Sequence, residues 1–215
     1  MSRPSYADAT RGLLRERLLD AADELLVESD WAAITMAAVA RRAGVSRQTL
    51  YNEFGSRQEF AQAYVLREAD RFLRSAEHAI ADHRHDPEAA LAAAFSGFLT
   101  AAADNPLVRA MVAGDPGSGL VALVTTRGGL VLGAASERLA AFFVATWPQL
   151  PDREARVTAE CVVRLAISHA LLPAASAEIA GGSVAALLGP YLEQLIAGDG
   201  VTPPRAPAAA PRAAR

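Results

Sequence analysis

The stretch "VARRAGVSRQTLYNEFGSRQEF", residues 39–60, contains the clearest turn and helix-capping signals in this chain. Gly44 allows a sharp turn, and Ser46 follows it with a hydroxyl of the kind that caps the first turn of a helix. Ser56 repeats the signal, with Glu59 three residues later, which is the capping-box spacing. The pattern predicts a short helix between two turns, followed directly by a further helix.

Outward from this stretch, apolar residues recur with the period of helices rather than of strands, so we expect an all-α protein. A helix is expected at about residues 10–29, and a second from Thr35 to Gly44. Apolar residues from Leu66 to Ile80 have a heptad-like rhythm, which predicts a long helix that leaves the first domain. Prolines and glycines then separate helices expected at about residues 87–103, 105–113, 117–146, 152–172 and 183–197.

Composition divides the chain into three parts. We expect a three-helix domain at residues 10–56 and a second α-helical domain at residues 57–198, joined by the long helix. Charges become sparse after the segment "DHRHDPE", and alanine, leucine and valine dominate. Residues 199–215 are mainly proline, alanine and arginine, which cannot bury a core, so we expect a disordered tail.

The chain has the composition of a folded protein that is neither exported nor embedded in a membrane. Apolar residues make up 52% of its 215 residues. Arg127, Glu137 and Arg138 bracket the most hydrophobic segment, and "MSRPSYADATRG" lacks the apolar core of a signal peptide. Cys161 alone provides a thiol, so it is expected to be a small buried residue. We therefore expect a cytoplasmic protein with no membrane partner.

Positive charge gathers within the opening stretch although the net charge is −3. Between residues 41 and 57, Arg41, Arg42, Arg47 and Arg57 stand against a single acid, Glu53. An acidic protein is a poor nonspecific binder of polyanions, whereas a local basic patch is typical of a specific nucleic-acid site.

A helix, a glycine turn and a serine-capped second helix form the helix-turn-helix arrangement, whose second helix enters the major groove of DNA. Arginine suits guanine, glutamine and asparagine suit adenine, and a threonine methyl packs on thymine. Side chains of these types, with one tyrosine, occupy the free face of the short helix: Arg47, Gln48, Thr49, Tyr51 and Asn52. A solvated helix pair within a bundle is the alternative interpretation.

The string "ITMAAVARRAGVSRQTLYNEFGSRQEF" resembles the DNA-binding domain of TetR-type transcriptional regulators, over roughly residues 10–60. In that family a threonine opens the second helix, "AxxAGVS" makes the turn and "TLYxxF" forms the recognition helix. The resemblance implies phosphate contacts from Thr35, Tyr51 and Arg57, and base contacts from Arg47, Gln48, Thr49 and Asn52.

The sequence departs from the family pattern in two ways. Lysine is common in the family where Arg57 stands, and both residues suit a phosphate. Histidine or arginine is often found where Asn52 or Glu53 stands. Because DNA would repel the Glu53 carboxylate, we expect that side chain to turn away or to pair with a neighbouring arginine.

The resemblance also implies a homodimer on a palindromic double-stranded DNA operator, with the last two long helices forming a four-helix interface. The segment "VTAECVVRLAISHALL" is apolar nearly all round, which suits a helix covered on both sides. A monomeric core is the alternative. The last helix carries a wide apolar stripe: Val184, Leu187, Leu188, Tyr191 and Leu195.

A ligand cavity in the second domain is implied as well, and few polar residues are available to line it. Ordinary core packing is the alternative for each candidate. Gly129 and Gly133 lie one turn apart and leave a bare groove, while Arg164 is expected to pair with Glu160. The candidate lining residues are Phe95, Phe98, Leu99, Met111, Leu123, Leu130, Phe142 and His169. Such a lining favours a small apolar effector with one polar end, such as a fatty acid or acyl derivative.

The segment "SRQTLYNEFGSRQEFAQAYVLREADRFL" is similar to TetR-type proteins found beside genes for alkane oxidation, which implies the same class of ligand. No catalytic triad, carboxylate-pair motif or phosphate-binding glycine loop is evident, so we expect neither an enzyme nor a cofactor or metal. We expect a repressor that ligand releases from DNA through the long helix. The alternative is an all-helical lipid-binding carrier, or a dimeric scaffold whose N-terminal helices bind a protein partner.

Overall fold

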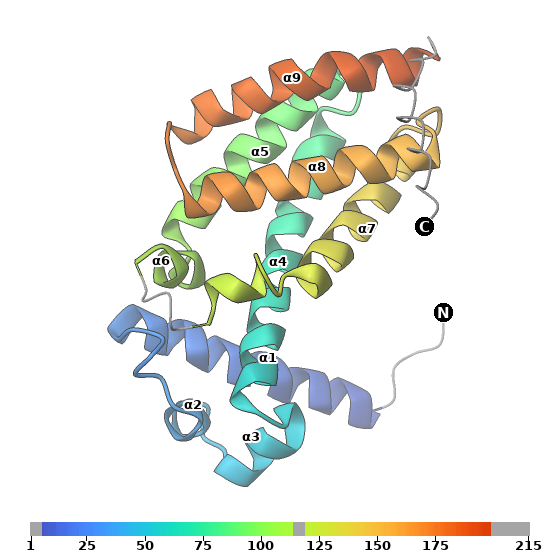
Figure 1. Cartoon of the computed structure of the whole chain (residues 1–215). Coiled ribbons are helices and arrows are strands. Elements are labelled where there is room, and N and C mark those ends of the chain that lie inside the picture. The colour runs from blue at the N-terminus through green and yellow to red at the C-terminus, as the bar shows by residue number, and fades with distance from the viewer. Residues whose placement is uncertain (1–5, 114–118, 199–215) are drawn as a thin grey trace, which may run out of the picture.

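The computed structural model describes residues 6–113 and 119–198, and within these ranges all regular structure is helical (Figure 1). The predicted all-α fold is confirmed. An N-terminal group comprises α1 (Tyr6–Glu28), α2 (Met36–Arg42) and α3 (Arg47–Phe54). From it α4 (Arg57–Asp82) runs into the rest of the molecule: α5 (Pro87–Asp104), α6 (Pro106–Ala113), the short 3-10 helix η2 (Val121–Leu123), α7 (Gly129–Thr146), α8 (Asp152–Leu171) and α9 (Ala177–Ala197).

The helix starts predicted around the opening stretch are confirmed by their caps. Thr35 Oγ1 accepts a hydrogen bond from Ala38 N at 3.1 Å, and Ser46 Oγ accepts one from Thr49 N at 3.0 Å. The Ser56 hydroxyl likewise caps α4. Between α2 and α3 the chain turns at Gly44, whose φ of +70° is a backbone conformation that favours glycine.

The core of the N-terminal group extends into α4. Trp31 stacks on Phe60 and Tyr64 of α4, with ring centroids 6.5 and 6.0 Å apart. Phe54, the last residue of α3, meets Phe60 edge to face at 5.0 Å. Leu50 on α3 is completely buried in the same cluster. These contacts fix the start of α4 to α3 and to the segment between α1 and α2.

The larger part of the molecule is built around α4. This helix packs against α5 and α7, α8 lies against α7, and α9 runs along α5 at the opposite end from α1 (Figure 1). Ile80, Phe143 and Leu192 are among the buried residues of this second core. Trp147, after α7, donates its indole N–H to the Arg84 carbonyl oxygen at 2.7 Å, which ties the ends of α4 and α7 together.

The last helix begins at Ala177, six residues before its predicted start, and the prediction was wrong because "AGGS" was interpreted as a break. Ser176 caps the helix through Ile179 N at 3.3 Å. Gly181 instead marks a close helix crossing, since a Cβ there would lie 3.0 Å from the Ala92 carbonyl oxygen of α5.

The helix predicted at residues 117–146 begins only at Gly129, and residues 119–128 form η2 and turns. Residues 117 and 118 lie outside the described ranges. A Cβ at Gly128 would be 2.6 Å from the Val124 carbonyl carbon, so the chain folds back on itself here. The Thr125 hydroxyl also bonds the Val121 carbonyl oxygen at 2.8 Å, which favours a turn.

The start of the first helix, the C-terminal tail and the domain boundary were also predicted from the sequence. The first helix starts at Tyr6, four residues earlier than predicted. The predicted tail at residues 199–215 lies outside the described ranges. The domain boundary at residues 56 and 57 stays a prediction, and α6 packs against α1 across it.

Two helices, α7 and α9, are long and apolar enough to cross a bilayer by length and composition alone. The bracketing charges concern only the segment within α7, and they do not keep that helix from meeting these criteria. Core helices of other proteins pass the same test, and both helices pack here against neighbours. Arg138 of α7 makes an ion pair with Glu77 of α4 at 2.7 Å, which places a charged contact in the middle of one candidate span.

Candidate DNA interface and ligand cavity

The candidate base-reading residues share the outer face of α3. Arg47, Gln48 and Asn52 are exposed, whereas Leu50 on the opposite face is fully buried. Gln48 Nε2 donates to Asn52 Oδ1 at 2.7 Å, so the two amides form one unit. The Arg47 guanidinium lies 5.9 Å from the centre of the half-buried Tyr51 ring. The structure thus presents arginine, amide and phenol groups together on the surface of the recognition helix.

Two of the candidate hydroxyls also serve the backbone. Thr49 is half-buried and shares a 2.8 Å hydrogen bond with Ser46 Oγ. Thr35 is exposed at the start of α2, where its oxygen caps the helix. Thr35 Oγ1 accepts its hydrogen bond from Ala38 N, so its proton can still be donated to DNA. Either hydroxyl can be the donor in the Ser46–Thr49 pair, and Thr49 keeps a proton for DNA when Ser46 donates.

Arg57 has a structural contact that the sequence did not predict. Its Nη2 donates to the Trp31 carbonyl oxygen at 2.7 Å, and the guanidinium lies 5.6 Å from the Trp31 ring centre. This contact fastens the segment between α1 and α2 to the start of α4. The guanidinium has further N–H groups, and the predicted phosphate contact stays a prediction.

Glu53 pairs with arginines, as predicted. Its carboxylate accepts hydrogen bonds from Arg11 at 2.8 Å and Arg15 at 3.0 Å, and its side chain is only 7% exposed. Arg15 also lies over the Phe54 ring, 4.5 Å from its centre. The acid in the recognition helix is therefore neutralised by α1 and does not oppose DNA.

The charge of Arg42, like that of Glu53, is paired with residues of α1. It pairs with Glu28 at 2.6 Å and with Glu24 at 3.3 Å, both on α1. The hydrogen bond from Arg42 lowers the pKa of Glu28 below its usual value. Arg41 remains exposed. Local positive charge facing DNA thus comes from fewer arginines than the sequence suggested.

A cavity of about 150 Å³, here called the inner cavity, lies among α4, α5, α7 and α8. Three of the predicted lining residues meet in it, namely Phe95, Phe98 and Met111. Phe98 contacts Phe72 of α4 edge to face at 5.1 Å. Among the described residues that line it, Glu68 is the one charged group.

A second pocket of about 400 Å³, here called the outer pocket, adjoins the inner cavity at α6 and the end of α8. Two more predicted lining residues, Leu99 and His169, lie here instead. The other three line neither space. Leu123 is buried in the core beneath the N-terminal group, Phe142 is half-buried against the second core, and Leu130 is 54% exposed.

The groove expected at Gly129 and Gly133 receives no neighbouring helix. A Cβ added at either glycine would meet no described atom within 4 Å. Both glycines are exposed, as is Leu130 beside them. This face of α7 is therefore turned away from both the inner cavity and the outer pocket.

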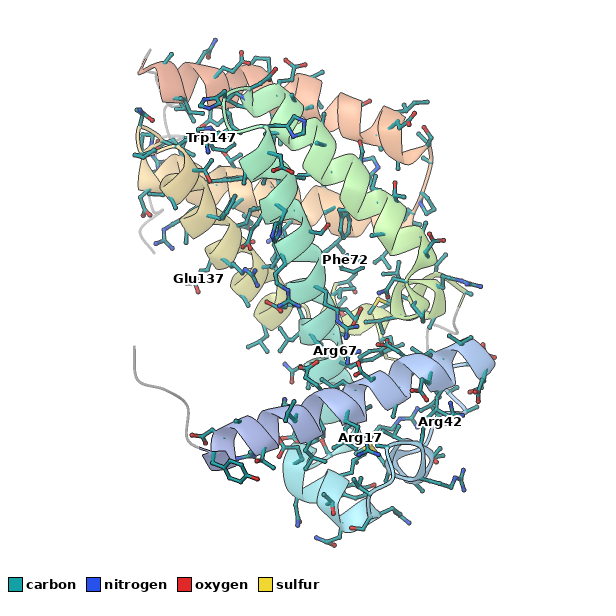
Figure 2. The ribbon with its side chains drawn as sticks, turned by 180° about the vertical axis from the view of Figure 1, so that it is seen from behind. Arg17, Arg42, Arg67, Phe72, Glu137 and Trp147 are labelled. Atoms are coloured by element: carbon teal, nitrogen blue, oxygen red, sulfur yellow. The ribbon has the colours of Figure 1, made fainter. Side chains whose placement is uncertain are left out.

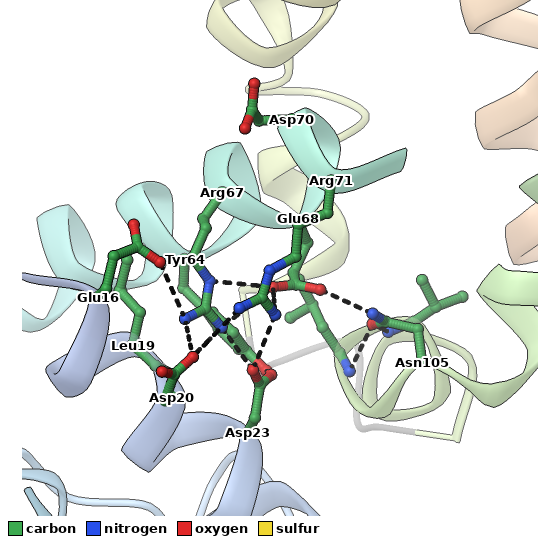
Figure 3. Close-up of polar contacts among 12 residues, drawn as sticks. Glu16, Leu19, Asp20, Asp23, Tyr64, Arg67, Glu68, Asp70, Arg71 and Asn105 are labelled. Carbon is green, nitrogen blue, oxygen red and sulfur yellow. Dashed lines mark hydrogen bonds and ion pairs between the residues drawn. The ribbon is translucent and has the colours of Figure 1, made fainter. Parts of the chain in front are cut away.

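An ionic network links Glu68, which lines the inner cavity, to carboxylates of α1 (Figures 2 and 3). Arg67 lies where α4 passes α1, with its side chain 6% exposed. It donates to Asp20 at 2.7 Å and to Asp23 at 2.5 Å, both on α1 (Figure 3). Tyr64 also donates to Asp23, and burial together with that carboxylate raises the pKa of the phenol well above its usual range.

The other half of this network is centred on Glu68, the charged residue of the inner cavity. Its carboxylate accepts hydrogen bonds from Arg67 at 3.1 Å and from Arg71 at 3.0 Å. Asn105, at the start of α6, donates to the second carboxylate oxygen at 2.8 Å (Figure 3). The network therefore links α1, α4 and α6 through one side chain that also faces the cavity. Its partners lie far apart in the sequence, so no local pattern signalled it.

The outer faces of α8 and α9 expose apolar side chains. Val157 and Leu172 on the α8 side are 52% and 76% exposed, and Ile179 and Leu187 of α9 are 64% and 75% exposed. Cys161 lies on the exposed face of α8, so the expectation that it is buried was wrong for the single chain. Its neighbours Arg164 and Glu160 pair at 2.7 Å as predicted.

The described residues contain no group of three or more histidine, cysteine, aspartate or glutamate side chains that could hold a metal ion. The histidines of the segment "HRHDPE" have other partners. His83 shares a hydrogen bond with the Ala79 carbonyl oxygen at 2.9 Å, and His85 accepts one from Arg84 at 3.1 Å. Asp86 of the same segment caps α5 through Ala89 N.

Two family models match the chain. Residues 18–64 match the model described as bacterial regulatory proteins, tetR family. Residues 86–190 match that of the bacterial tetracyclin repressor, C-terminal domain. The two matches correspond to the helix-turn-helix group with the start of α4 and to the helices that follow it.

Known proteins show the same likeness. The HTH-type transcriptional regulator AlkX of Mycobacterium tuberculosis is 39% identical over 194 residues, which is 90% of this chain and 92% of that one. A crystal structure of the TetR family repressor AlkX from Dietzia sp. strain DQ12-45-1b, implicated in biodegradation of n-alkanes, superposes with a TM-score of 0.76. It is 35% identical and covers 85% of this chain and 96% of its own. Proteins of this kind regulate transcription and are not enzymes, as predicted. The chain belongs to the TetR family of transcriptional regulators.

Proposed function

We propose that the protein is a repressor that binds a palindromic operator as a homodimer in the cytoplasm and is released by a small apolar effector. The single observation that carries this proposal is the course of α4. The helix starts at Arg57, one turn after the recognition helix, and its residues from Val65 to Ile80 line the inner cavity. An occupant of the cavity therefore presses on the same helix that positions α3.

DNA recognition is assigned to the exposed face of α3 and its surroundings. We assign base contacts to Arg47, Gln48, Thr49 and Asn52, since their side chains match the hydrogen-bonding and methyl groups of base edges. Thr35, Tyr51 and Arg57 are assigned to phosphates. Free backbone N–H groups at the starts of α2 and α4 favour a phosphate for the same reason.

Dimerisation is assigned to the exposed apolar faces of α8 and α9. Their unpartnered side chains, Val157, Leu172, Ile179 and Leu187, form the kind of surface that marks a protein interface. A twofold dimer would place two recognition helices on half-sites one helical turn apart, which matches a palindromic operator.

Release is assigned to movement of α4 against α1. Arg67 and Glu68 are neighbours on α4, and one faces the carboxylates of α1 while the other faces the cavity. Because packed interfaces change between discrete arrangements, a ligand that displaces Glu68 shifts the contacts of Arg67 with Asp20 and Asp23. The spacing of the two α3 helices then no longer fits the two grooves.

The effector class follows from the lining of the inner cavity, which is apolar apart from Glu68. A fatty acid or acyl derivative has the long apolar part that such a lining favours. The Dietzia repressor in the same family is implicated in biodegradation of n-alkanes, which supports an effector of aliphatic character.

A salt titration tests the DNA-binding assignment. An operator duplex is selected from a random library, and its affinity for the wild type is compared with that of the double variant Arg47→Ala and Tyr51→Ala. Loss of a phosphate contact should lower the salt slope by about 1 and the base contact should cost about 1–3 kcal/mol per site. Arg153→Ala, an exposed arginine on α8, is the control and should bind as the wild type does.

Unchanged affinity and unchanged salt slope in the double variant would contradict this assignment. Equal loss in the Arg153→Ala control would show that any arginine contributes by long-range attraction alone. A selection that yields no preferred duplex would contradict the proposal of a specific operator.

A further inference from the structure

We propose that the inner cavity and the outer pocket are two compartments of one binding site for an amphiphile, with the anionic head group at Arg109 and His169 and the aliphatic tail in the inner cavity. The inference rests on the proposed function only in that the occupant is the effector. Beyond the proposed function, we assign the orientation of the bound molecule and the residues that recognise its head group.

The two spaces adjoin each other and share lining residues. Val108 of α6 and Ala170 of α8 line both of them. Phe95, which lines the inner cavity, meets His169 of the outer pocket edge to face at 5.6 Å. A molecule that extends past this aromatic pair reaches from one compartment into the other.

Charge distinguishes the two compartments. Glu68 is the charged group among the described residues of the inner cavity, and its carboxylate is already hydrogen-bonded to Arg67, Arg71 and Asn105. A second carboxylate placed there would be buried beside a like charge, which is costly. The inner cavity therefore accepts an aliphatic chain and rejects an anionic head group.

The outer pocket offers the opposite environment. Arg109 and His169 line it together with the hydroxyl-bearing Thr100, and Arg109 and Thr100 are exposed to solvent. An arginine guanidinium binds a carboxylate or phosphate through parallel N–H groups, and a histidine N–H adds a further donor. A head group here remains partly hydrated, so it is not stripped of water when the tail is buried.

Size supports the same division. Pockets for small ligands usually have volumes of about 300–1,000 Å³, which the inner cavity alone does not reach at about 150 Å³. The outer pocket adds about 400 Å³, and the two together fall within the usual range. The inner cavity is therefore assigned to the aliphatic tail and not to the whole molecule.

The test compares two ligands that differ in the head group alone, dodecanoate and dodecanol. Calorimetric titrations use the full-length protein, freed of bound lipid, as wild type and as the double variant Arg109→Gln and His169→Gln. We expect affinity for dodecanoate to fall about tenfold in the variant, as for loss of a charge-assisted hydrogen bond, with dodecanol changed less than about twofold. Arg153→Gln should bind both ligands as the wild type does.

A second variant tests the tail compartment. Ala166→Phe places a ring in the inner cavity, which Ala166 lines, and should weaken both ligands alike. Thermal denaturation of each variant shows whether it is folded. If Ala166→Phe does not fold, Ala166→Val, which adds less volume, takes its place.

Equal loss of dodecanoate and dodecanol in the Arg109 and His169 variant would overturn the head-group assignment, as would no loss of either. Failure of both ligands to bind the wild type would overturn the two-compartment site. If dodecanoate binds as expected but leaves the operator complex intact, the site stands and the proposed release mechanism fails.

Discussion

Arg67 of α4 and Asp20 of α1 form an ion pair of 2.7 Å at the junction between the recognition helices and the ligand cavity. The arginine is almost fully buried, while the aspartate is about half exposed. The guanidinium also pairs with Asp23 and Glu68, and more distantly with Glu16 at 3.9 Å. One buried cation thus serves four carboxylates on two helices, so the relative position of α1 and α4 depends on discrete contacts, as the proposed release requires.

Replacing Arg67 by methionine should destabilise the protein by about 3–5 kcal/mol, because Asp23 and Glu68 would keep their partly buried charge without this partner. Urea denaturation at a fixed protein concentration measures the loss. Arg74→Met is the matched control on the same helix. Arg74 pairs with Asp70 at an exposed position, so its loss should cost less than about 1 kcal/mol. Equal losses in the two variants would show that the junction holds no special charge pair.

Gly181→Ala should destabilise the protein by about 1–3 kcal/mol, because the added methyl group would force α9 away from α5. The nearest backbone atoms, the Ala92 carbonyl oxygen and the Ser96 nitrogen, would each be 3.0 Å from the new Cβ. Gly97→Ala on α5 meets nothing within 4 Å and should instead stabilise its helix by about 0.5–1 kcal/mol. Thermal denaturation distinguishes the two, and a neutral Gly181→Ala would contradict the close crossing.

Gly181 also shows where the sequence was informative and where it was not. Caps and turns act within a few residues, so Thr35, Ser46 and Ser56 located the helix-turn-helix from local chemistry alone. A glycine pair, by contrast, has the same local appearance in a turn and at a helix crossing. Only the approach of Ala92 and Ser96 of α5, which lie far earlier in the chain, distinguishes them.

The candidate site, too, was predictable from the sequence only where local helical periodicity determines it. The exposed face of α3 follows from helical periodicity once Leu50 and Phe54 are assigned to the core. The lining of the cavity does not, because Leu123, Leu130 and Phe142 have the same apolar character as the residues that line it. The Arg67 network was missed for a physical reason, since its partners are joined only by the packing of α1 on α4.

Acid should weaken the contact between α1 and α2. The hydrogen bond from Arg42 lowers the pKa of Glu28 from 4.5, so this carboxylate stabilises the folded state above its unfolded pKa. That contribution is lost as the pH falls through the lowered folded pKa. Glu28→Gln should therefore melt below the wild type near pH ~7, and the gap should close toward pH ~3. A gap that is independent of pH would contradict the assignment.

Leu187→Asp should convert the dimer to a monomer, because the charge would be placed in the apolar face assigned to the interface. Light scattering after size exclusion measures the mass, which should fall to that of one 22.6 kDa chain. Val27→Asp alters an equally exposed apolar residue on α1 and should leave the dimer intact. A dimer that survives Leu187→Asp, or a wild type that is monomeric, would contradict the assigned interface.

We propose that occupation of the cavity releases the protein from its operator through α4. Fluorescence anisotropy of a labelled operator duplex, followed while dodecanoate is added at fixed salt, tests it most directly. We predict that the anisotropy falls to that of free DNA, with a midpoint that tracks the dodecanoate affinity measured by calorimetry. Unchanged anisotropy at concentrations that saturate the cavity would contradict the claim.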